Sequence, residues 1–90
     1  GLPSLRGTML LVDDEAHVRE IAALALRQCG LTVLEAPHGA AALALCAEHG
    51  AGLDLILLDL TMPGLSGEET LRRLRQQGAT QKVILMSGYS

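Results

Sequence analysis

The sequence predicts an α/β fold in which helices cover a parallel sheet. Two observations lead to this prediction: short apolar runs recur along the chain, and segments with helical spacing of apolar residues separate them. Strands that alternate with helices in this way form right-handed βαβ crossovers and a parallel sheet. The length of 90 residues allows one such domain.

Four segments are expected to be strands, at residues 9–12, 31–35, 55–58 and 82–86. Three of them contain a continuous apolar stretch: residues 9–12, 55–58 and 83–86. A short run without polar alternation is typical of a strand that is buried on both faces of a sheet. Lys82 opens the fourth of these strands.

Three helices are expected between the strands. The first has one apolar stripe and stops before Gly30. The second is rich in alanine, follows the break at Pro37 and Gly39, and ends near Gly50, whereas Ser66 is expected to cap the third. The residues expected to face the core are Val18, Ile21, Ala22, Ala25, Leu26 and Cys29 in the first helix, Ala42, Leu43 and Cys46 in the second, and Leu71 and Leu74 in the third.

Composition and charge argue against several classes of function. The net charge of −3 gives no electrostatic basis for binding nucleic acid. No apolar run approaches the roughly 18 residues that suggest a membrane span, so no membrane contact is expected for this domain. Residues 1–7 lack the apolar run of a signal peptide and are interpreted as a linker or the tail of a preceding domain, with residues 8–90 as the domain itself.

The number and spacing of the cysteines predict the cellular compartment of the protein. Cys29 and Cys46 are too few for a disulfide framework and lack the spacing of a metal site. Both lie in apolar helical patterns, so we expect two buried free thiols. Free thiols of this kind are typical of a reducing compartment, which predicts the cytoplasm.

Acidic residues follow two of the predicted strands. Asp13 and Asp14 come directly after the first strand, and Asp59 comes directly after the third. In open parallel sheets, ligands bind at the carboxyl ends of the strands, near the point where the strand order reverses. In a flavodoxin-like sheet, here with the order 2-1-3-4, strands one and three are neighbours. The three carboxylates are therefore expected to converge.

Convergence of carboxylates creates an electrostatic conflict, because like charges a few Å apart repel one another. A divalent cation removes the conflict, and Mg²⁺ is usually held by one or two carboxylates together with phosphate oxygens. A carboxylate can also accept a phosphoryl group covalently. These acids therefore predict a Mg²⁺ site for phosphoryl chemistry. The alternative is that Asp13, Asp14 and Glu15 merely cap the first helix.

Three segments resemble the signature segments of response-regulator receiver domains, the phosphoacceptor modules of two-component signalling. They are Leu11-Val12-Asp13-Asp14-Glu15, Leu57-Leu58-Asp59-Leu60-Thr61-Met62-Pro63 and Met86-Ser87-Gly88-Tyr89. The resemblance runs in register from about Thr8 to Ser90. An acid pair alone is a weak signal. An acid pair, an acceptor aspartate, a Met-Pro loop and a hydroxyl after strand four, in this order, form a specific one.

The resemblance implies a role for each matching residue. It implies that Asp59 is the phosphoacceptor, that Asp14 binds Mg²⁺ directly, and that Asp13 often acts on the metal through water. It also implies that the backbone carbonyl of Thr61 binds the metal and that the hydroxyl of Ser87 reaches a phosphoryl oxygen. The N–H groups of Leu60 and Gly88 are implied to line the phosphoryl pocket. The implied partner is a histidine kinase or a histidine phosphotransfer domain.

One part of the family pattern does not occur in these 90 residues. Receivers have an essential Lys at the end of a fifth strand, followed by a fifth helix, whereas this chain stops after the expected fourth strand. Lys82 does not match that Lys, because it precedes strand four at the opposite end of the sheet. The fourth strand is therefore expected to expose an apolar edge, through which two copies of the chain could pair.

Three classes of function stay open from the sequence. The first is a phosphoacceptor switch in a phosphorelay. The second is a receiver-fold interaction module that is not phosphorylated, suggested by the missing Lys. The third is a hydrolase or phosphotransferase with an aspartate nucleophile, but haloacid-dehalogenase-like enzymes use a DxD motif, whereas Asp13 and Asp14 are adjacent.

The short lead-in before the first strand and the Met86-Ser87-Gly88-Tyr89 ending resemble receivers of hybrid sensor kinases. Regulators with a DNA-binding output can look alike in this region.

Overall fold

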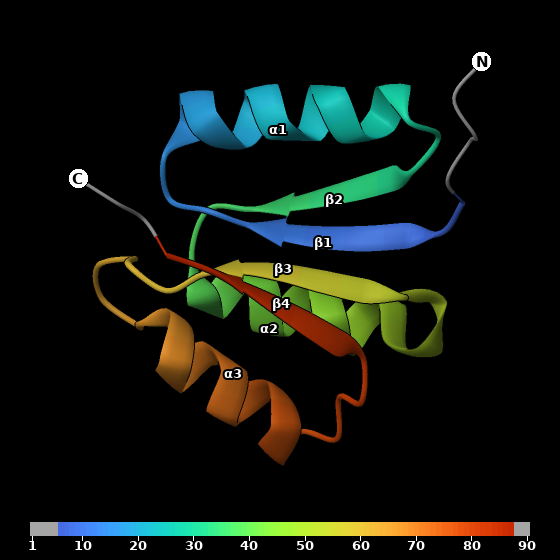
Figure 1. Cartoon of the computed structure of the whole chain (residues 1–90). Helices are drawn as coiled ribbons and strands as arrows, with labels where there is room; N and C mark the ends of the chain where they lie inside the picture. The colour runs from blue at the N-terminus through green and yellow to red at the C-terminus, as the bar shows by residue number, and fades with distance from the viewer. Residues whose placement is uncertain (1–5, 88–90) are drawn as a thin grey trace.

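The computed structural model describes residues 6–87, which form a four-stranded sheet between two layers of helices (Figure 1). The elements, in chain order, are β1 (Thr8–Val12), α1 (Ala16–Gln28), β2 (Thr32–Ala36), α2 (Gly39–His49), a 3₁₀ turn η1 (Gly50–Gly52), β3 (Leu55–Asp59), α3 (Gly67–Gln76) and β4 (Lys82–Met86). Every predicted helix and strand is present, and the strand boundaries agree with the prediction to within one residue. The assignment of residues 1–7 to a linker stays a prediction, because most of that segment lies outside the described residues.

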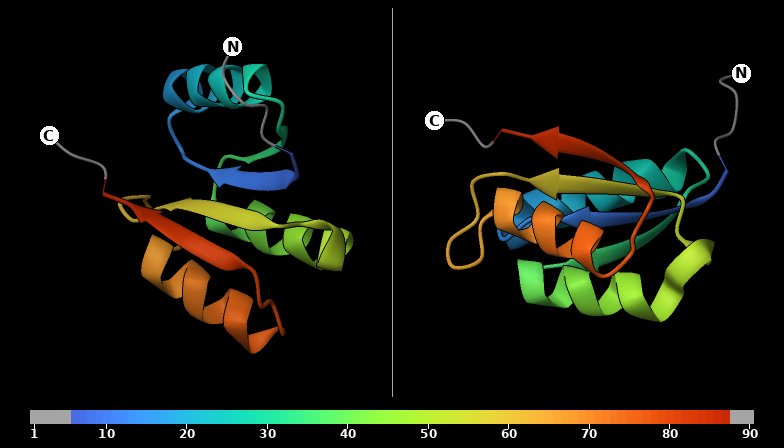
Figure 2. Two further views of the ribbon diagram at one scale, coloured as in Figure 1. Left: turned by 45° about the vertical axis from the view of Figure 1, so that its right-hand side comes forward. Right: turned by 90° about the horizontal axis from the view of Figure 1, so that it is seen from below.

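All neighbouring strands are parallel, in the order β2-β1-β3-β4. This order confirms the predicted flavodoxin-like arrangement. Figure 1 and Figure 2 show α1 on one face of the sheet and α2 and α3 on the other. Strands β1 and β3 lie at the centre of the sheet and run in the same direction, so their carboxyl ends meet at one edge.

The core has two parts because the central strands are covered on both faces. Along β1, Leu10 and Val12 pack on the side of α2 and α3, whereas Met9 and Leu11 pack on the side of α1. These four side chains are almost completely buried. Burial on both faces explains why β1 has no polar alternation. It also makes the strand a rigid support for the residues that follow Val12.

The predicted buried face of α1 was partly wrong. Ala22, Ala23 and Leu26 pack against the sheet, but Ile21 is 69% exposed and Val18 is exposed as well. Apolar residues occupy more than one side of this helix, and periodicity alone does not say which side meets the sheet. Ala25, also expected to face the core, is exposed, and the larger apolar residues Val18, Ile21 and Leu24 lie on the outer side of the helix.

The prediction for the cysteines was half correct. Cys46 on α2 is buried, and burial raises the pKa of its thiol, while the nearby Arg75 charge opposes that shift. Cys29 is exposed. It is the C-cap residue of α1, beyond the last turn that packs on the sheet, so its side chain has no core to enter.

The two helices on the other face begin with side-chain caps. Ser66 caps α3 as predicted, because its Oγ accepts a hydrogen bond from the Glu69 N–H at 3.1 Å. His38 caps α2, since its Nδ1 accepts from the Ala41 N–H at 3.0 Å. The sequence did not predict the His38 cap, because histidine is not among the common N-cap residues.

Strand β4 forms the edge of the sheet within the described residues, where it pairs with β3 alone. Ile84 is 43% exposed and Leu85 is also exposed. The predicted apolar edge is therefore present in the described part of the chain. In the same part, no helix combines the length and the apolar character that crossing a membrane requires.

Candidate functional site

Three aspartates meet at the edge of the sheet where β1 and β3 end. Asp13 and Asp14 follow β1, and Asp59 is the last residue of β3. One carboxylate oxygen from each lies within 4.8 Å of the others. Asp13 and Asp59 are only 7% and 6% exposed, whereas Asp14 is exposed. The expected convergence is confirmed, because parallel neighbours place residues of the same register together.

Asp13 is held mainly through its backbone. Its N–H donates to the Ala36 carbonyl at the end of β2 at 3.1 Å. Its Oδ1 accepts a hydrogen bond from the Glu15 N–H at 2.9 Å, which is an Asx-type turn. Glu15 is the N-cap residue of α1, yet its side chain makes no capping hydrogen bond. Helix capping therefore accounts for one bond of Asp13 and does not explain the position of Asp14 or Asp59.

Asp59 is oriented by the residue two positions further along the chain. Its Oδ1 accepts one hydrogen bond from the Thr61 N–H and another from the Thr61 hydroxyl, both at 2.9 Å. Within residues 6–87, Oδ2 accepts no hydrogen bond. One oxygen is thus fixed by two donors and the other is available. The sequence did not reveal this role of the Thr61 side chain, although threonine hydroxyls commonly bond to nearby acceptors.

The segment after Asp59 is held by β4 and α3. The Leu60 N–H donates to the Met86 carbonyl at 2.8 Å, so it is not free in this structure to line a phosphoryl pocket. Thr61 provides the N–H that reaches the carboxylate instead. Gly67, at the start of α3, lies so close that a Cβ there would be 2.4 Å from the Asp59 carbonyl oxygen.

Ser87 and Lys82 lie at opposite ends of β4. Met86 pairs with Asp59, and therefore Ser87 follows at the same edge as the three aspartates. Lys82 pairs with Leu55 at the far end of β3, so it does not match the family's catalytic Lys, as expected. Gly88 lies outside the described residues, and its implied role stays a prediction.

The three aspartates fit a hard divalent cation. All the donors are carboxylate oxygens, which suit Mg²⁺ or Ca²⁺ rather than zinc or copper. Among residues 6–87, no Arg, Lys or His forms an ion pair with any of them. Two nearly buried carboxylates without a cation are electrostatically unfavourable. The cluster is therefore compatible with a divalent-cation site.

The histidines and the charged groups of α3 lie apart from this cluster. The histidines His17, His38 and His49 are exposed, and none of them belongs to the group of acids that could hold a metal in the described part of the chain. On α3, Glu69 forms ion pairs with Arg72 and Arg73, and hydrogen bonds from these arginines lower the pKa of its carboxyl. These pairs lie on the solvated face of α3.

Comparison with known families identifies the family to which this fold belongs. The family model for the response regulator receiver domain matches residues 9–90. The chain belongs to the response regulator receiver family. The two acids after β1, the acid that ends β3 and the loop that follows it thus lie on the receiver fold, as the resemblance implied.

Curated relatives show how much of a receiver protein the chain covers. It is 41% identical over 83 residues to the sensor kinase CckA of Brucella abortus and 45% identical over 79 residues to the phosphate regulon transcriptional regulatory protein PhoB of Pseudomonas aeruginosa. These matches include 92% and 88% of the chain but only 9% and 34% of the relatives. The receiver is thus similar to part of a sensor kinase and to part of a transcriptional regulator.

Solved structures agree with the fold. The receiver domain of the hybrid histidine kinase CckA has a TM-score of 0.85 and 40% identity, and the match covers 93% of this chain and 78% of that one. The response regulator TrrA of Thermotoga maritima, solved in complex with Mg(2+)-BeF, has a TM-score of 0.77 and 34% identity, with 93% and 71% covered. The backbone that carries the aspartates is therefore that of a receiver.

Proposed function

We propose that this receiver accepts a phosphoryl group on Asp59 in a two-component phosphorelay. The observation that carries the proposal is the state of the Asp59 carboxylate: Oδ1 is fixed by Thr61, while Oδ2 accepts no hydrogen bond within residues 6–87. The carboxylate also lies beside Asp13 and Asp14, within the reach of one metal ion. A fixed and nucleophilic oxygen next to a cation site is what phosphoryl transfer to an aspartate needs.

In the proposed step, Asp59 Oδ2 attacks the phosphorus of a phosphohistidine on a histidine kinase or a histidine phosphotransfer domain. The new P–O bond forms as the P–N bond breaks, and the imidazole leaves with the electron pair of that bond. Thr61 keeps the carboxylate in the orientation that presents Oδ2. Ser87, at the same edge of the sheet, is proposed to donate its hydroxyl to a phosphoryl oxygen.

Mg²⁺ is the proposed cofactor, held by Asp13, Asp14, Asp59 and the Thr61 carbonyl. When bound, it supplies positive charge that neutralises the transferring oxygens. The Mg(2+)-BeF complex of TrrA supports the choice of this ion, because that protein is 34% identical to the chain. For the amide donors of the phosphoryl pocket we propose Gly88 and Leu60, and the Leu60 N–H would have to leave the Met86 carbonyl to take this role.

The proposed location is the cytoplasm, where the free thiols Cys29 and Cys46 would stay reduced. In the same compartment, a kinase or phosphotransfer partner would meet the edge that carries Asp59. We also propose that isolated copies of the chain pair through the exposed edge of β4.

The decisive experiment is phosphorylation with acetyl phosphate and Mg²⁺, followed by intact mass spectrometry. We expect one phosphoryl adduct on the wild-type chain and none on Asp59→Asn. Asp54→Asn is the matched control, because Asp54 lies next to the opposite end of β3, bonds to the Thr8 N–H, and can keep that bond as an amide. The test is run on this chain and, if the chain is a segment of a longer native protein, on that protein as well.

A second candidate function is a receiver-fold interaction module that is not phosphorylated. The observation that favours it is the hydrogen bond from the Leu60 N–H to the Met86 carbonyl, because it occupies a donor expected to line the phosphoryl pocket. If folded protein forms no phosphoryl adduct, either as this chain or within a longer native protein, the result would support the interaction module and contradict the phosphoacceptor function. Turnover of a small phosphoester would instead indicate a hydrolase.

A further inference from the structure

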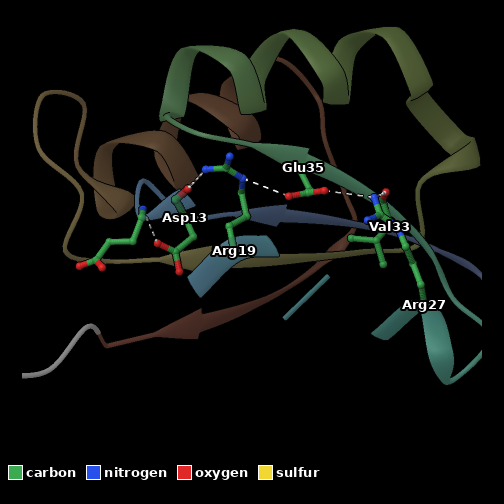
Figure 3. Close-up of polar contacts among 6 residues, drawn as sticks. Asp13, Arg19, Arg27, Val33 and Glu35 are labelled. Carbon is green, nitrogen blue, oxygen red and sulfur yellow. Dashed lines mark hydrogen bonds and ion pairs between the residues drawn. The ribbon is translucent and has the colours of Figure 1, made fainter. Parts of the chain in front are cut away.

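Arg19, on the first turns of α1, reaches back to the backbone of the acid pair. Its Nη1 donates to the Asp13 carbonyl oxygen at 2.8 Å, and its Nε pairs with Glu35 Oε1 at 3.2 Å. The other oxygen of Glu35 pairs with Arg27 Nη2 at 3.2 Å. Arg27 Nη2 in turn donates to the Val33 carbonyl at 2.7 Å. Figure 3 shows these residues as one connected row between α1 and β2.

The two arginines differ in what they hold. The Arg19 side chain is 14% exposed, and its carbonyl partner is the backbone of Asp13, whose carboxylate belongs to the acid cluster. The Arg27 side chain is 46% exposed, and its carbonyl partner lies within β2. Both share one carboxylate, that of Glu35. Arg27 is therefore a natural control for Arg19, with the same charge, the same partner and a contact outside the acid cluster.

The Asp13 carbonyl matters because it belongs to the peptide unit that joins Asp13 to Asp14. That unit is planar, so fixing its carbonyl also fixes the direction of the Asp14 N–H and the Asp14 Cα. The Asp13 N–H is already held by the Ala36 carbonyl at 3.1 Å. With Arg19 on the carbonyl, the backbone of the first acid is held on both sides, and the Asp14 carboxylate starts from a fixed position.

We propose that Arg19, oriented by Glu35, is a positioning residue that sets the geometry of the Asp13–Asp14 pair for the divalent cation. This inference rests on the proposed metal-dependent function. The guanidinium suits the role because its planar fork donates to a carbonyl and to a carboxylate at once. Some residues do not bind the metal themselves but orient its ligands. Removing such a residue typically lowers metal affinity by about 10–100-fold.

The sign of the effect separates positioning from simple electrostatics. Arg19 carries a positive charge next to a cation site, so if charge alone mattered, its removal would strengthen Mg²⁺ binding. Positioning predicts the opposite, because Asp14 loses its fixed backbone. Arg27→Gln removes an equal charge from the same Glu35 without touching Asp13. It therefore reports the effect of losing an ion pair to Glu35.

The test is isothermal titration calorimetry with Mg²⁺ on the wild type, Arg19→Gln, Arg27→Gln and Arg19→Lys. We expect Arg19→Gln to weaken Mg²⁺ binding about tenfold, and Arg27→Gln to change it less than about twofold. Arg19→Lys keeps the charge and one donor, so we expect it to recover part of the affinity. Thermal unfolding by circular dichroism shows whether each variant is folded at the titration temperature, and Arg19→Lys still tests the proposal if Arg19→Gln does not fold.

A second measurement needs no metal. The ¹³C chemical shift of the Asp13 carbonyl should change in metal-free Arg19→Gln and stay unchanged in Arg27→Gln, since Arg19 donates to that oxygen whereas Arg27 donates to the Val33 carbonyl. Binding of Mg²⁺ by Arg19→Gln that is equal to or tighter than that of the wild type would overturn the positioning role and leave the proposed function standing. A folded wild type that binds no Mg²⁺ would instead overturn the proposed metal site, and the inference with it.

Discussion

At the scale of single residues, the site depends on close approaches that only particular side chains allow. Gly67 lets the start of α3 pack directly on the backbone that follows β3, next to the Asp59 carbonyl and the Leu60 Cα. Thr61 fixes one oxygen of Asp59 with two donors. Neither residue is an acid or a metal ligand through its side chain. Both nevertheless decide where the acceptor carboxylate lies.

Gly67→Ala should destabilise the domain. The added Cβ would lie 2.4 Å from the Asp59 carbonyl oxygen and 2.6 Å from the Leu60 Cα, and backbone atoms cannot rotate away as a flexible side chain could. We expect the free energy of unfolding to fall by about 1–3 kcal/mol, the usual cost of overpacking. Urea denaturation measures this loss.

Gly52→Ala is the control for that substitution, because a Cβ at this position would meet nothing within 4 Å. We expect its free energy of unfolding to stay within about 0.5 kcal/mol of the wild-type value, as is usual for surface changes. Equal denaturation midpoints for the two alanine variants would show that the approach of α3 to β3 tolerates a methyl group.

At the scale of elements, two apolar surfaces have no cover in the described part of the chain. One is the outer side of α1, with Val18, Ile21 and Leu24, and the other is β4, with Ile84 and Leu85. They differ in kind. The β4 edge presents unpaired backbone N–H and C=O groups together with apolar side chains, and such edges pair readily with another strand. The outer side of α1 offers only apolar contact.

Substitution of one isoleucine on each surface should tell the two apart. We expect the 90-residue chain to self-associate through β4, and Ile84→Lys to weaken that association about tenfold or more, because charge on an edge strand opposes pairing. Ile21→Lys adds the same charge to α1, where Ile21 is 69% exposed, and should change the association little. Sedimentation velocity over a range of concentrations measures both.

The opposite ranking, with Ile21→Lys as the variant that releases monomers, would assign the contact to α1. A wild-type chain that sediments as a monomer at all concentrations would contradict the proposed pairing altogether.

At the scale of the whole molecule, the fold brings charges together at a cost in stability. The core is mostly apolar, yet Asp13 and Asp59 are almost buried beside Asp14. Repulsion among these groups favours the unfolded state, where they separate. A cation that binds only the folded site reverses that effect by mass action. Stability should therefore depend on Mg²⁺.

Mg²⁺ at about one hundred times its dissociation constant should stabilise the wild type by about 2.7 kcal/mol. Asp14→Asn should lose most of this gain because it removes a ligand. Without metal, however, the same variant should be more stable than the wild type by about 1 kcal/mol, the repulsion between two unit charges about 4 Å apart in water. Thermal unfolding with Mg²⁺ and with a chelator gives both differences.

Asp54→Asn is the control for this experiment, since Asp54 lies outside the cluster and accepts from the Thr8 N–H at 2.8 Å. It should respond to Mg²⁺ as the wild type does. A wild-type melting temperature that does not change with Mg²⁺ would contradict the proposed site, as would a metal-free Asp14→Asn that is less stable than the wild type.

The sequence by itself determined the order of the elements, the strand order and the meeting of Asp13, Asp14 and Asp59. These features follow from local patterns: apolar runs predict buried strands, and the acids stand at fixed positions relative to the strand ends. The caps follow the same logic in part, since Ser66 was predictable and His38 was not.

Only the tertiary structure decided which side of α1 meets the sheet, which N–H groups near Asp59 are free, and which arginine reaches Asp13. The apolar residues of α1 are spread around the helix, so the choice depends on the shape of the sheet beneath it. The Leu60 N–H is taken by Met86, a residue of another strand. Arg19 contacts the Asp13 carbonyl while its Nε pairs with Glu35, a residue of β2. These three features depend on how side chains from distant segments pack, and the spacing of apolar and acidic residues along the chain does not encode that packing.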